Sequence, residues 1–273
     1  HSFLVIKNDS IVFEEYWDEW AVDNNKSNSF SMAKSVISLL VGAAIQDGVV
    51  LGLDHPVKDV FPNMSFFEGK KNVTIGNLLN MSAGLDWKEN YFNPFNITAK
   101  AYLTKNLSDL ALGLSFNSEP GVVYNYQSGA TQIATLMLES LLLEKLNVSL
   151  SMYTESRLWD YIGAEESALW SLDDRGGVVK GYCCFHSNAK DFAKIGRLFL
   201  KRGALDGRPF FNDDYFNSVV DFNLVDFYSF GWWRGSYLGV NFYYMRGFLG
   251  QFVVVVPEYD LIIVRLGRKD KLN

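Results

Sequence analysis

Ser31 and Lys34, three positions apart, are the residues of this sequence whose types and spacing best suit catalysis. On a helix, positions i and i+3 lie on one face, so the amine of Lys34 can reach the hydroxyl of Ser31. A serine hydroxyl is a weak nucleophile that needs a base, and a lysine kept neutral by burial can be that base. The beginning of a buried helix also favours developing negative charge. The pair therefore predicts nucleophilic catalysis at Ser31.

The Ser-x-x-Lys pattern is weak when taken alone. With 23 serines and 16 lysines in 273 residues, about one match is expected by chance, and two occur. The second, Ser187 to Lys190, opens a predicted amphipathic helix over 187–202, in which Ser187 reads as the N-cap and Lys190 as a solvated side chain. Ser31 instead heads an apolar helix, where a lysine needs a reason. The alternative for the first pair is a capped helix whose lysine snorkels to solvent.

A second pattern is the Pro120-Gly121 turn that leads into Tyr126-Gln127-Ser128, directly before a long apolar-periodic helix. Two Tyr-x-Asn sequences, at 91–93 and 215–217, neither follow Pro-Gly nor precede a long helix, so we set them aside. Taken alone, Tyr126 would read as an ordinary half-buried tyrosine.

A third pattern covers residues 244–251, where Gly247 lies in a predicted late strand. A glycine there lets a substrate lie close along the strand edge. The alternative is a plain core strand with a bulge.

In this order, the three patterns resemble the penicillin-binding-protein and β-lactamase-like serine hydrolases. The resemblance is nearest to the class C β-lactamase and esterase branch, and within it to members like the 6-aminohexanoate-dimer hydrolases. These proteins carry Ser-x-x-Lys, then Tyr-x-Asn or Tyr-x-Ser after a Pro-Gly turn, then a Lys-Thr-Gly-like strand. The resemblance extends over nearly the whole chain and includes residues 78–85 and 191–203.

The resemblance implies a role for each matched residue. Tyr126 would move the proton, and Ser128 stands where many relatives have asparagine. Gly247 matches the glycine of Lys-Thr-Gly, and the backbone N–H of Phe248 would share an oxyanion hole with that of Ser31.

The late strand is also where the chain departs from the β-lactamases. Met245 stands where the lysine should be, and Arg246 stands where the hydroxyl residue should be. A penicillin carboxylate would lose its usual anchor unless Arg246 replaces it. Esters or amides are therefore better expected substrates than antibiotics.

The expected activity is two-step acyl transfer on a small-molecule or short-peptide substrate, as in a carboxylesterase, an amide hydrolase or a D-Ala peptidase. The non-enzymatic alternative is an acyl-binding sensor or penicillin-binding module with slow or no turnover. A Ser-His-Asp α/β-hydrolase is disfavoured, because the sequence has no Gly-x-Ser-x-Gly elbow. The pattern leaves the substrate and the oligomeric state open.

The order of the predicted elements indicates an α/β (α+β) fold of β-lactamase/transpeptidase type: an antiparallel sheet flanked by helices, with an inserted helical region. Residues 1–48 and 166–273 would form the sheet-containing region with the nucleophile helix, and 49–165 the mostly helical region. A hairpin over 3–17 turns at Asn8-Asp9-Ser10, and a glycine at 48 caps the first helix. Further helices are expected over 128–146, 149–162, 187–202 and 213–220. Strands are expected at Trp170, 178–185, 229–234, 240–248, 251–257 and 261–266.

The resemblance also implies a helix before the first strand and another after the last. Neither pattern is present, so a fragment of a longer protein is one interpretation of the chain. A bacterial periplasmic or secreted location is likewise implied by the resemblance alone.

Composition excludes several other functions. The net charge of −6 and a pI of about 5.2 disfavour nucleic acid as a partner. The longest apolar stretch, 36–45, is too short for a membrane span. The histidines at 1, 55 and 186 lack metal-ligand spacing and are expected on the surface or in loops, so we predict no metal site and no cofactor. Neighbouring cysteines such as Cys183 and Cys184 seldom bridge each other.

Aromatic residues are concentrated between positions 222 and 248. They could line an apolar substrate pocket. Packing within a sheet is the preferred interpretation of such a run.

Overall fold

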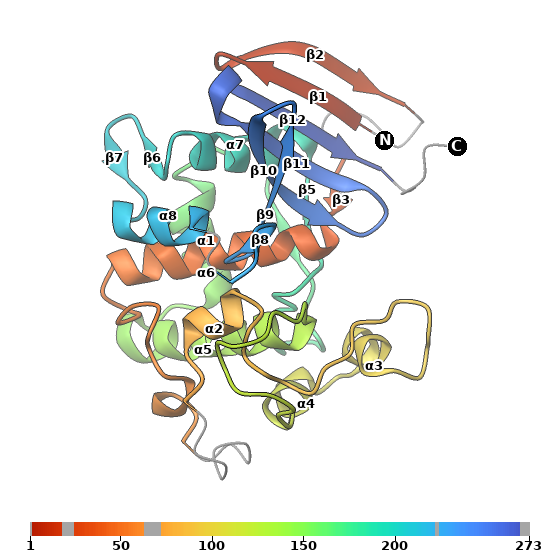
Figure 1. Ribbon diagram of the computed structural model, residues 1–273, viewed down its shortest axis with the longest axis vertical. Helices are drawn as coiled ribbons and strands as arrows, with labels where there is room; N and C mark the ends of the chain where they lie inside the picture. Colours follow the sequence, from red (N-terminus) through yellow and green to blue (C-terminus); the bar gives the residue numbers. More distant parts are fainter. Residues whose placement is uncertain (1, 18–24, 63–71, 222–223, 268–273) are drawn as a thin grey trace.

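The two ends of the chain form one antiparallel sheet, as the strand patterns predict (Figure 1). The computed structural model describes residues 2–17, 25–62, 72–221 and 224–267. The seven-stranded sheet has the order β2-β1-β12-β11-β10-β9-β8. Its strands are β1 (Ser2–Lys7), β2 (Ser10–Tyr16), β8 (Tyr228–Ser229), β9 (Trp232–Tyr237), β10 (Val240–Gly247), β11 (Gln251–Val256) and β12 (Leu261–Leu266).

Strand β1 joins the beginning of the chain to its end, because it lies between β2 and β12. Ser2 is paired with Leu266 and Lys7 with Leu261, in antiparallel register. In the turn to β2, Asn8 and Asp9 have φ angles of 50° and 59°. Asparagine and aspartate tolerate this left-handed conformation, which tight hairpin turns require. The predicted opening hairpin is confirmed.

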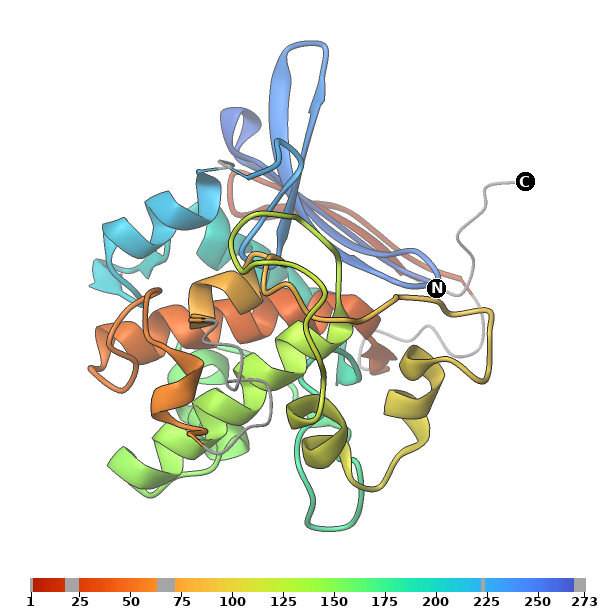
Figure 2. The same ribbon diagram turned by 60° about the horizontal axis from the view of Figure 1, so that its bottom comes forward.

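Helix α1 (Ala33–Gln46) runs through the middle of the molecule, between the sheet and helix α5 (Ser128–Leu146) (Figures 1 and 2). All its residues up to Ala44 are buried, which explains why the sequence is apolar on every side of the helix. Its polar Ser35 donates to the carbonyl oxygen of Gly231 at 2.6 Å, so burial leaves this hydroxyl satisfied. Gly48 follows the helix with a φ of +72°, as expected of a C-terminal cap.

Further helices cover the sheet and surround α1. They are α2 (Ile75–Leu79), α3 (Ile97–Leu103), α4 (Leu107–Leu112), α6 (Leu150–Thr154), α7 (Ala189–Leu200) and α8 (Asp213–Val220). Helix α7 packs on β11 and β12. A Cβ at Gly196 would come within 2.9 Å of Val253 Cγ1, so glycine lets this helix lie close to the sheet. The predicted α/β fold with an antiparallel sheet flanked by helices is confirmed.

The strand predicted over 178–185 is wrong. Only Phe185–Ser187 (β5) forms a strand there, in a small sheet with β3 (Ser27–Asn28) and β4 (Leu169–Trp170). Gln132 of α5 accepts from the backbone N–H of Gly181 at 3.1 Å and donates to the carbonyl of Val179 at 2.9 Å. Since these backbone groups bond to a side chain, they do not extend a β-ladder.

Cys183 and Cys184 form a disulfide, so the expectation that these neighbours would not bridge is wrong. In a strand, successive side chains point to opposite faces of the sheet. Here the two cysteines lie in a turn instead, and Cys184 has a φ of +65°. The turn brings the two thiols to the same side of the chain.

Two predicted helix limits also differ from the structure. The N-cap of α7 is Asn188, whose side chain accepts from the backbone N–H of Asp191 at 2.7 Å, and Ser187 ends β5 instead. Lys190 forms an ion pair with Glu14 at 2.9 Å, which differs from the solvated side chain that the sequence predicts.

The helix predicted over 149–162 is α6 continued by a π-helical turn, Glu155–Trp159. The predicted helices over 128–146 and 213–220 are confirmed.

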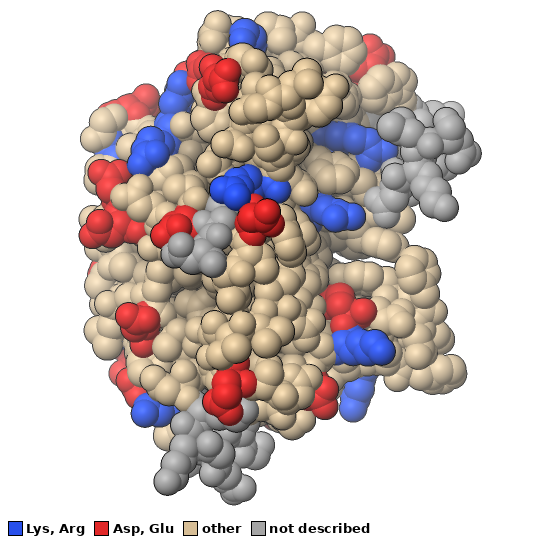
Figure 3. All heavy atoms as spheres, viewed as in Figure 1, with Lys and Arg blue, Asp and Glu red and all other residues tan. Residues whose placement is uncertain are grey.

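On the face seen in Figure 3, acidic and basic side chains are interspersed among a larger neutral area. Of the histidines, His55 is buried in a loop and accepts from the backbone N–H of Leu51. His186 lies in β5, and His1 lies outside the described residues. No helix in the described part of the chain is long and apolar enough to cross a membrane.

Candidate active site

Ser31 lies in the 3-10 turn Phe30–Met32, which leads directly into α1. The Nζ atom of Lys34 lies 3.1 Å from its Oγ atom, so the two side chains meet as their spacing predicts. Phe30, immediately before the serine, has a φ of +46°. A bulky residue rarely adopts this conformation, and backbone strain of this kind is concentrated at functional sites.

The amine of Lys34 is buried and contacts three oxygen atoms. The residue is only 2% exposed, so the snorkelling alternative is wrong. Besides Ser31, its Nζ atom lies 3.2 Å from Ser128 Oγ and 2.9 Å from the carbonyl oxygen of Tyr182. Burial lowers the pKa of Lys34 to about 8, and the negative charge of Glu89 opposes part of this shift. A substantial fraction of the amine is therefore neutral near pH 8.

Tyr126 faces the same pair of residues from the other side. Its ring centre lies 5.0 Å from Lys34 Nζ, and its side chain lines the same pocket as Ser31. Burial raises the pKa of Tyr126, and its interaction with Ser31 opposes only part of this shift. The phenol therefore carries its proton at neutral pH.

Glu89 is a member of this cluster that sequence reasoning missed. Its carboxylate accepts from Ser128 Oγ at 2.7 Å and from the backbone N–H of Ser128 at 2.9 Å. It also accepts from the indole N–H of Trp87 at 2.5 Å. No motif marks Glu89, because it reaches Ser128 from a loop that is distant in the sequence.

A pocket of about 270 Å³ opens over Ser31. Its lining residues are Ser31, Tyr91, Tyr126, Trp233, Arg246, Gly247 and Phe248. Tyr91 stacks on Phe248, with ring centres 5.1 Å apart, and Phe248 meets Phe30 edge-on at 5.8 Å. The predicted site residues therefore lie around one pocket, with Lys34 and Ser128 buried behind Ser31. Tyr91 and Trp233 are additions from the tertiary structure.

Strand β10 brings the third motif to this pocket. Met245 is fully buried, whereas Arg246 is exposed, as the alternation of a strand requires. The Arg246 guanidinium lies 5.6 Å from the ring centre of Trp233, at the pocket wall. A Cβ at Gly247 would come within 2.1 Å of the Ser29 carbonyl oxygen. Only glycine therefore lets β10 lie this close to the segment that carries Ser31.

Most aromatic residues between 222 and 248 serve packing, as preferred from the sequence. Trp232 is fully buried and stacks on Phe199 of α7, with ring centres 3.9 Å apart. Its neighbour Trp233 points the other way and lines the pocket, as does Phe248. Phe222 lies outside the described residues.

This arrangement can support acyl transfer. A partly neutral amine within hydrogen-bond distance of a serine hydroxyl can accept its proton. A protonated phenol that lines the same pocket can supply a proton to a departing group. An arginine at the pocket wall can pair with an anionic substrate group.

The fold is that of the β-lactamase-like proteins, and the chain belongs to the Beta-lactamase family, whose model matches residues 2–273. It is 24% identical over 298 residues to the 6-aminohexanoate-dimer hydrolase of Paenarthrobacter ureafaciens, covering 97% of this chain and 71% of that protein. The recognised family resemblance is thereby confirmed.

Solved structures with this fold include hydrolases of several kinds. A Bacillus anthracis protein assigned as a 6-aminohexanoate-dimer hydrolase has a TM-score of 0.85 at 19% identity, over 100% of this chain and 74% of its own. A D-stereospecific amidohydrolase from Streptomyces has a TM-score of 0.74 at 15% identity, over 98% and 89%. A family VIII carboxylesterase has a TM-score of 0.75 at 18% identity, over 100% and 87%.

Proposed function

We propose that this protein is a serine hydrolase that forms an acyl-enzyme on carboxylic esters or amides. Ser31 is the nucleophile, Lys34 the general base and Tyr126 the residue that passes a proton to the leaving group. The observation that carries the proposal is the buried Lys34 amine, 3.1 Å from the Ser31 hydroxyl and with its pKa lowered to about 8.

The hydrogen bonds around Lys34 support its role as the base. A neutral amine has two N–H donors and one lone pair. The carbonyl of Tyr182 can only accept, so it takes one N–H. The Ser128 hydroxyl donates its hydrogen bond to the carboxylate of Glu89. Its oxygen therefore accepts the second N–H of Lys34. The lone pair is left for the hydroxyl proton of Ser31.

In the acylation step, the Ser31 oxygen bonds to the substrate carbonyl carbon while its proton moves to Lys34. The backbone N–H groups of Ser31 and Phe248 hold the resulting oxyanion. The bond to the leaving alcohol or amine then breaks as Tyr126 gives that group a proton, and the ammonium of Lys34 restores the phenol. Water next attacks the acyl ester, a carboxylic acid leaves, and the Ser31 hydroxyl is restored.

Esters and amides are the proposed substrates, with D-Ala peptides among the amides. The relatives named above include an amidohydrolase and a carboxylesterase, which supports this range. With Met245 buried, the family's lysine anchor has no counterpart on the pocket side of β10, and Arg246 is the cation available there.

Hydrolysis of a chromogenic short-chain ester by the Ser31→Ala variant tests the nucleophile. We expect turnover to fall by about three orders of magnitude or more. Ser187→Ala is the matched control, because it removes the serine of the second Ser-x-x-Lys match. The buried Ser187 hydroxyl has no partner among the described residues, so this variant should keep wild-type turnover. Undiminished hydrolysis by Ser31→Ala would reject Ser31 as the nucleophile.

Intact-mass spectrometry separates an enzyme from an acyl-binding sensor. A fluorophosphonate should label wild type and Ser187→Ala but not Ser31→Ala. The acyl adduct formed from an ester substrate should then disappear within the turnover time. An ester adduct that persists for hours would favour the sensor.

A further inference from the structure

The Cys183–Cys184 disulfide lies in a turn that contacts the proposed base, Lys34, and the segment that precedes Ser31. On one side of the two cysteines, the carbonyl of Tyr182 accepts from Lys34 Nζ at 2.9 Å. On the other side, the carbonyl of Phe185 accepts from the backbone N–H of Ser29 at 2.8 Å. Ser29 lies two residues before the proposed nucleophile. The stretch 182–185 therefore contacts the proposed base at one end and the nucleophile segment at the other.

The disulfide restrains the part of this stretch that lies between the two contacts. Cys183 and Cys184 are 0% and 6% exposed, so the bond is internal to the fold. A covalent bond between neighbouring side chains closes a small ring, which removes conformations that the intervening peptide would otherwise visit. Cys184 is held at a positive φ, an orientation that few non-glycine residues adopt without support.

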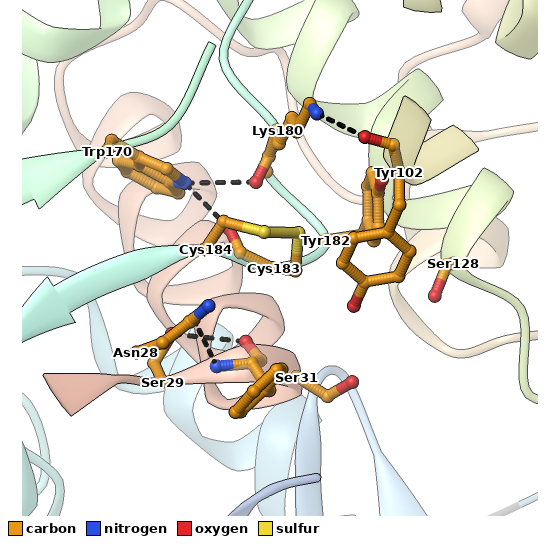
Figure 4. The surroundings of a disulfide bond; sticks show 12 residues. Asn28, Ser29, Ser31, Tyr102, Ser128, Trp170, Lys180, Tyr182, Cys183 and Cys184 are labelled. Carbon is orange, nitrogen blue, oxygen red and sulfur yellow. Dashed lines mark hydrogen bonds between the residues drawn. A yellow bond between two sulfur atoms is a disulfide. The ribbon is translucent and has the colours of Figure 1, made fainter. Parts of the chain in front are cut away.

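The side chain of Trp170 lies beside the turn and forms hydrogen bonds with it (Figure 4). The indole N–H of Trp170 contacts the carbonyls of Lys180 and Cys183, both at 3.0 Å. The Nζ atom of Lys180 donates to the carbonyl of Tyr102 at 2.7 Å. These contacts fix the chain on either side of Tyr182. The carbonyl groups that contact Lys34 and Ser29 belong to Tyr182 and Phe185, the residues directly before and after the two cysteines.

We propose that the Cys183–Cys184 disulfide is a positioning element for catalysis, which keeps the Tyr182 carbonyl on Lys34 and the Phe185 carbonyl on Ser29. The inference rests on the proposed function. The Tyr182 carbonyl takes one N–H of the amine, and this leaves the lone pair aimed at Ser31. Disulfides persist in oxidising compartments, which agrees with the expected periplasmic or secreted location.

Opening the disulfide should have a distinctive kinetic effect. The amine would lose a fixed acceptor, and water would enter beside it. Because burial is the main cause of its lowered pKa, hydration would move that pKa back toward the ordinary value. Acylation should slow, and the acidic limb of its pH profile should move to higher pH. Substrate binding in the pocket should change little, because the cysteines do not line it.

The test compares Cys183→Ser, Cys184→Ser and the double variant with wild type. Alkylation under denaturing conditions, with and without prior reduction, first counts free thiols by mass. In wild type, two thiols should become available only after dithiothreitol has supplied two electrons and two protons. The rate of fluorophosphonate labelling and the kcat and KM for an ester are then measured from pH 6 to 10. Tyr153→Phe is the control, since it removes a hydrogen bond to Asp47 at 2.6 Å far from the pocket.

We expect each cysteine variant to label about tenfold more slowly than wild type, with kcat reduced, KM kept and the acidic limb raised by about one pH unit. The double variant should equal each single variant, because all three remove the same bond. Tyr153→Phe should lose stability without shifting the pH profile. If the cysteine variants do not fold, wild type kept in dithiothreitol and shown by mass to hold two thiols gives the same comparison.

Three results would overturn the positioning role: free thiols in oxidised wild type, unchanged labelling in the cysteine variants, or effects of the single variants that add in the double. The last would mean that side-chain packing matters instead of the bond. If wild type is not labelled at Ser31 at all, the proposed function fails together with this inference. If Ser31 is labelled and the cysteine variants match wild type, only the positioning role fails.

Discussion

Ser128 lies 2.7 Å from a carboxylate oxygen of Glu89, and this contact determines the direction of the Ser128 hydroxyl. An ionised carboxylate can only accept, so the proton of Ser128 points to Glu89 and the oxygen is free to accept from Lys34. Glu89 thereby orients the proposed base without touching it.

Glu89→Gln should change both the height and the position of the pH–rate profile. For wild type, kcat/KM should rise with pH and level off above about 8, as Lys34 loses its proton. The charge of Glu89 raises the pKa of Lys34, so removing it should move the acidic limb to lower pH. The plateau should fall by about tenfold, because an amide holds Ser128 less well than a carboxylate. Glu165→Gln, at an exposed ion pair with Lys194, is the control and should leave the profile unchanged. A shift to higher pH in Glu89→Gln would contradict this account.

Tyr126→Phe should remove proton transfer while keeping the pocket wall. The ring packs near Trp233 and Tyr228, at 5.6 and 5.9 Å between centres, and phenylalanine retains both contacts. We expect kcat to fall by about 10² to 10³, with little change in KM or in melting temperature. Tyr124→Phe is the matched control, since the buried Tyr124 hydroxyl has no partner among the described residues. Steady-state kinetics on an amide and an ester would show the larger loss for the amide, whose leaving group needs the proton more.

Lys34→Met should be more stable than wild type at neutral pH, by an amount that shrinks as pH rises. The folded state lowers the pKa of Lys34 from 10.5 to about 8, so between these values the unfolded chain binds more protons than the folded chain. Wild-type stability therefore rises with pH across that window, by about 3 kcal/mol relative to a variant with no amine. Denaturant unfolding at pH 7.5 and 10 measures the difference between the two proteins. A difference that stays constant would mean that the amine titrates normally.

Arg246→Gln should weaken binding only for substrates with a carboxylate. The exposed guanidinium at the pocket wall can pair with an anion, whereas a neutral ester has no group for it to bind. We expect KM for an ester that carries a free carboxylate to rise by about tenfold, and KM for its neutral analogue to stay the same. Arg234→Gln, on the neighbouring strand β9 and outside the pocket lining, is the control. Equal effects on the two substrates would exclude Arg246 as an anchor.

The parts of the fold that sequence reasoning predicted best are those with local signals. The opening hairpin has a turn sequence, α1 is a continuous apolar run that ends before Gly48, and α5 and the strands β10 to β12 have their own apolar patterns, so their positions followed from local residues. The strand predicted over 178–185 failed because β-propensity says nothing about Gln132, which bonds to that backbone from another element.

The amino-acid sequence was enough to predict that Ser31 and Lys34 lie close together, because they are three positions apart at the beginning of one helical segment. It was also enough to find the other motifs in the order that the family has. The surroundings of the Lys34 amine, by contrast, depend on the packing of distant segments. Glu89, the carbonyl of Tyr182 and the rings of Tyr91 and Trp233 come from segments with no common period. Their approach depends on how α5, β10 and the loops pack around α1. Burial, which sets the pKa of Lys34, is a property of that packing and not of any stretch of sequence.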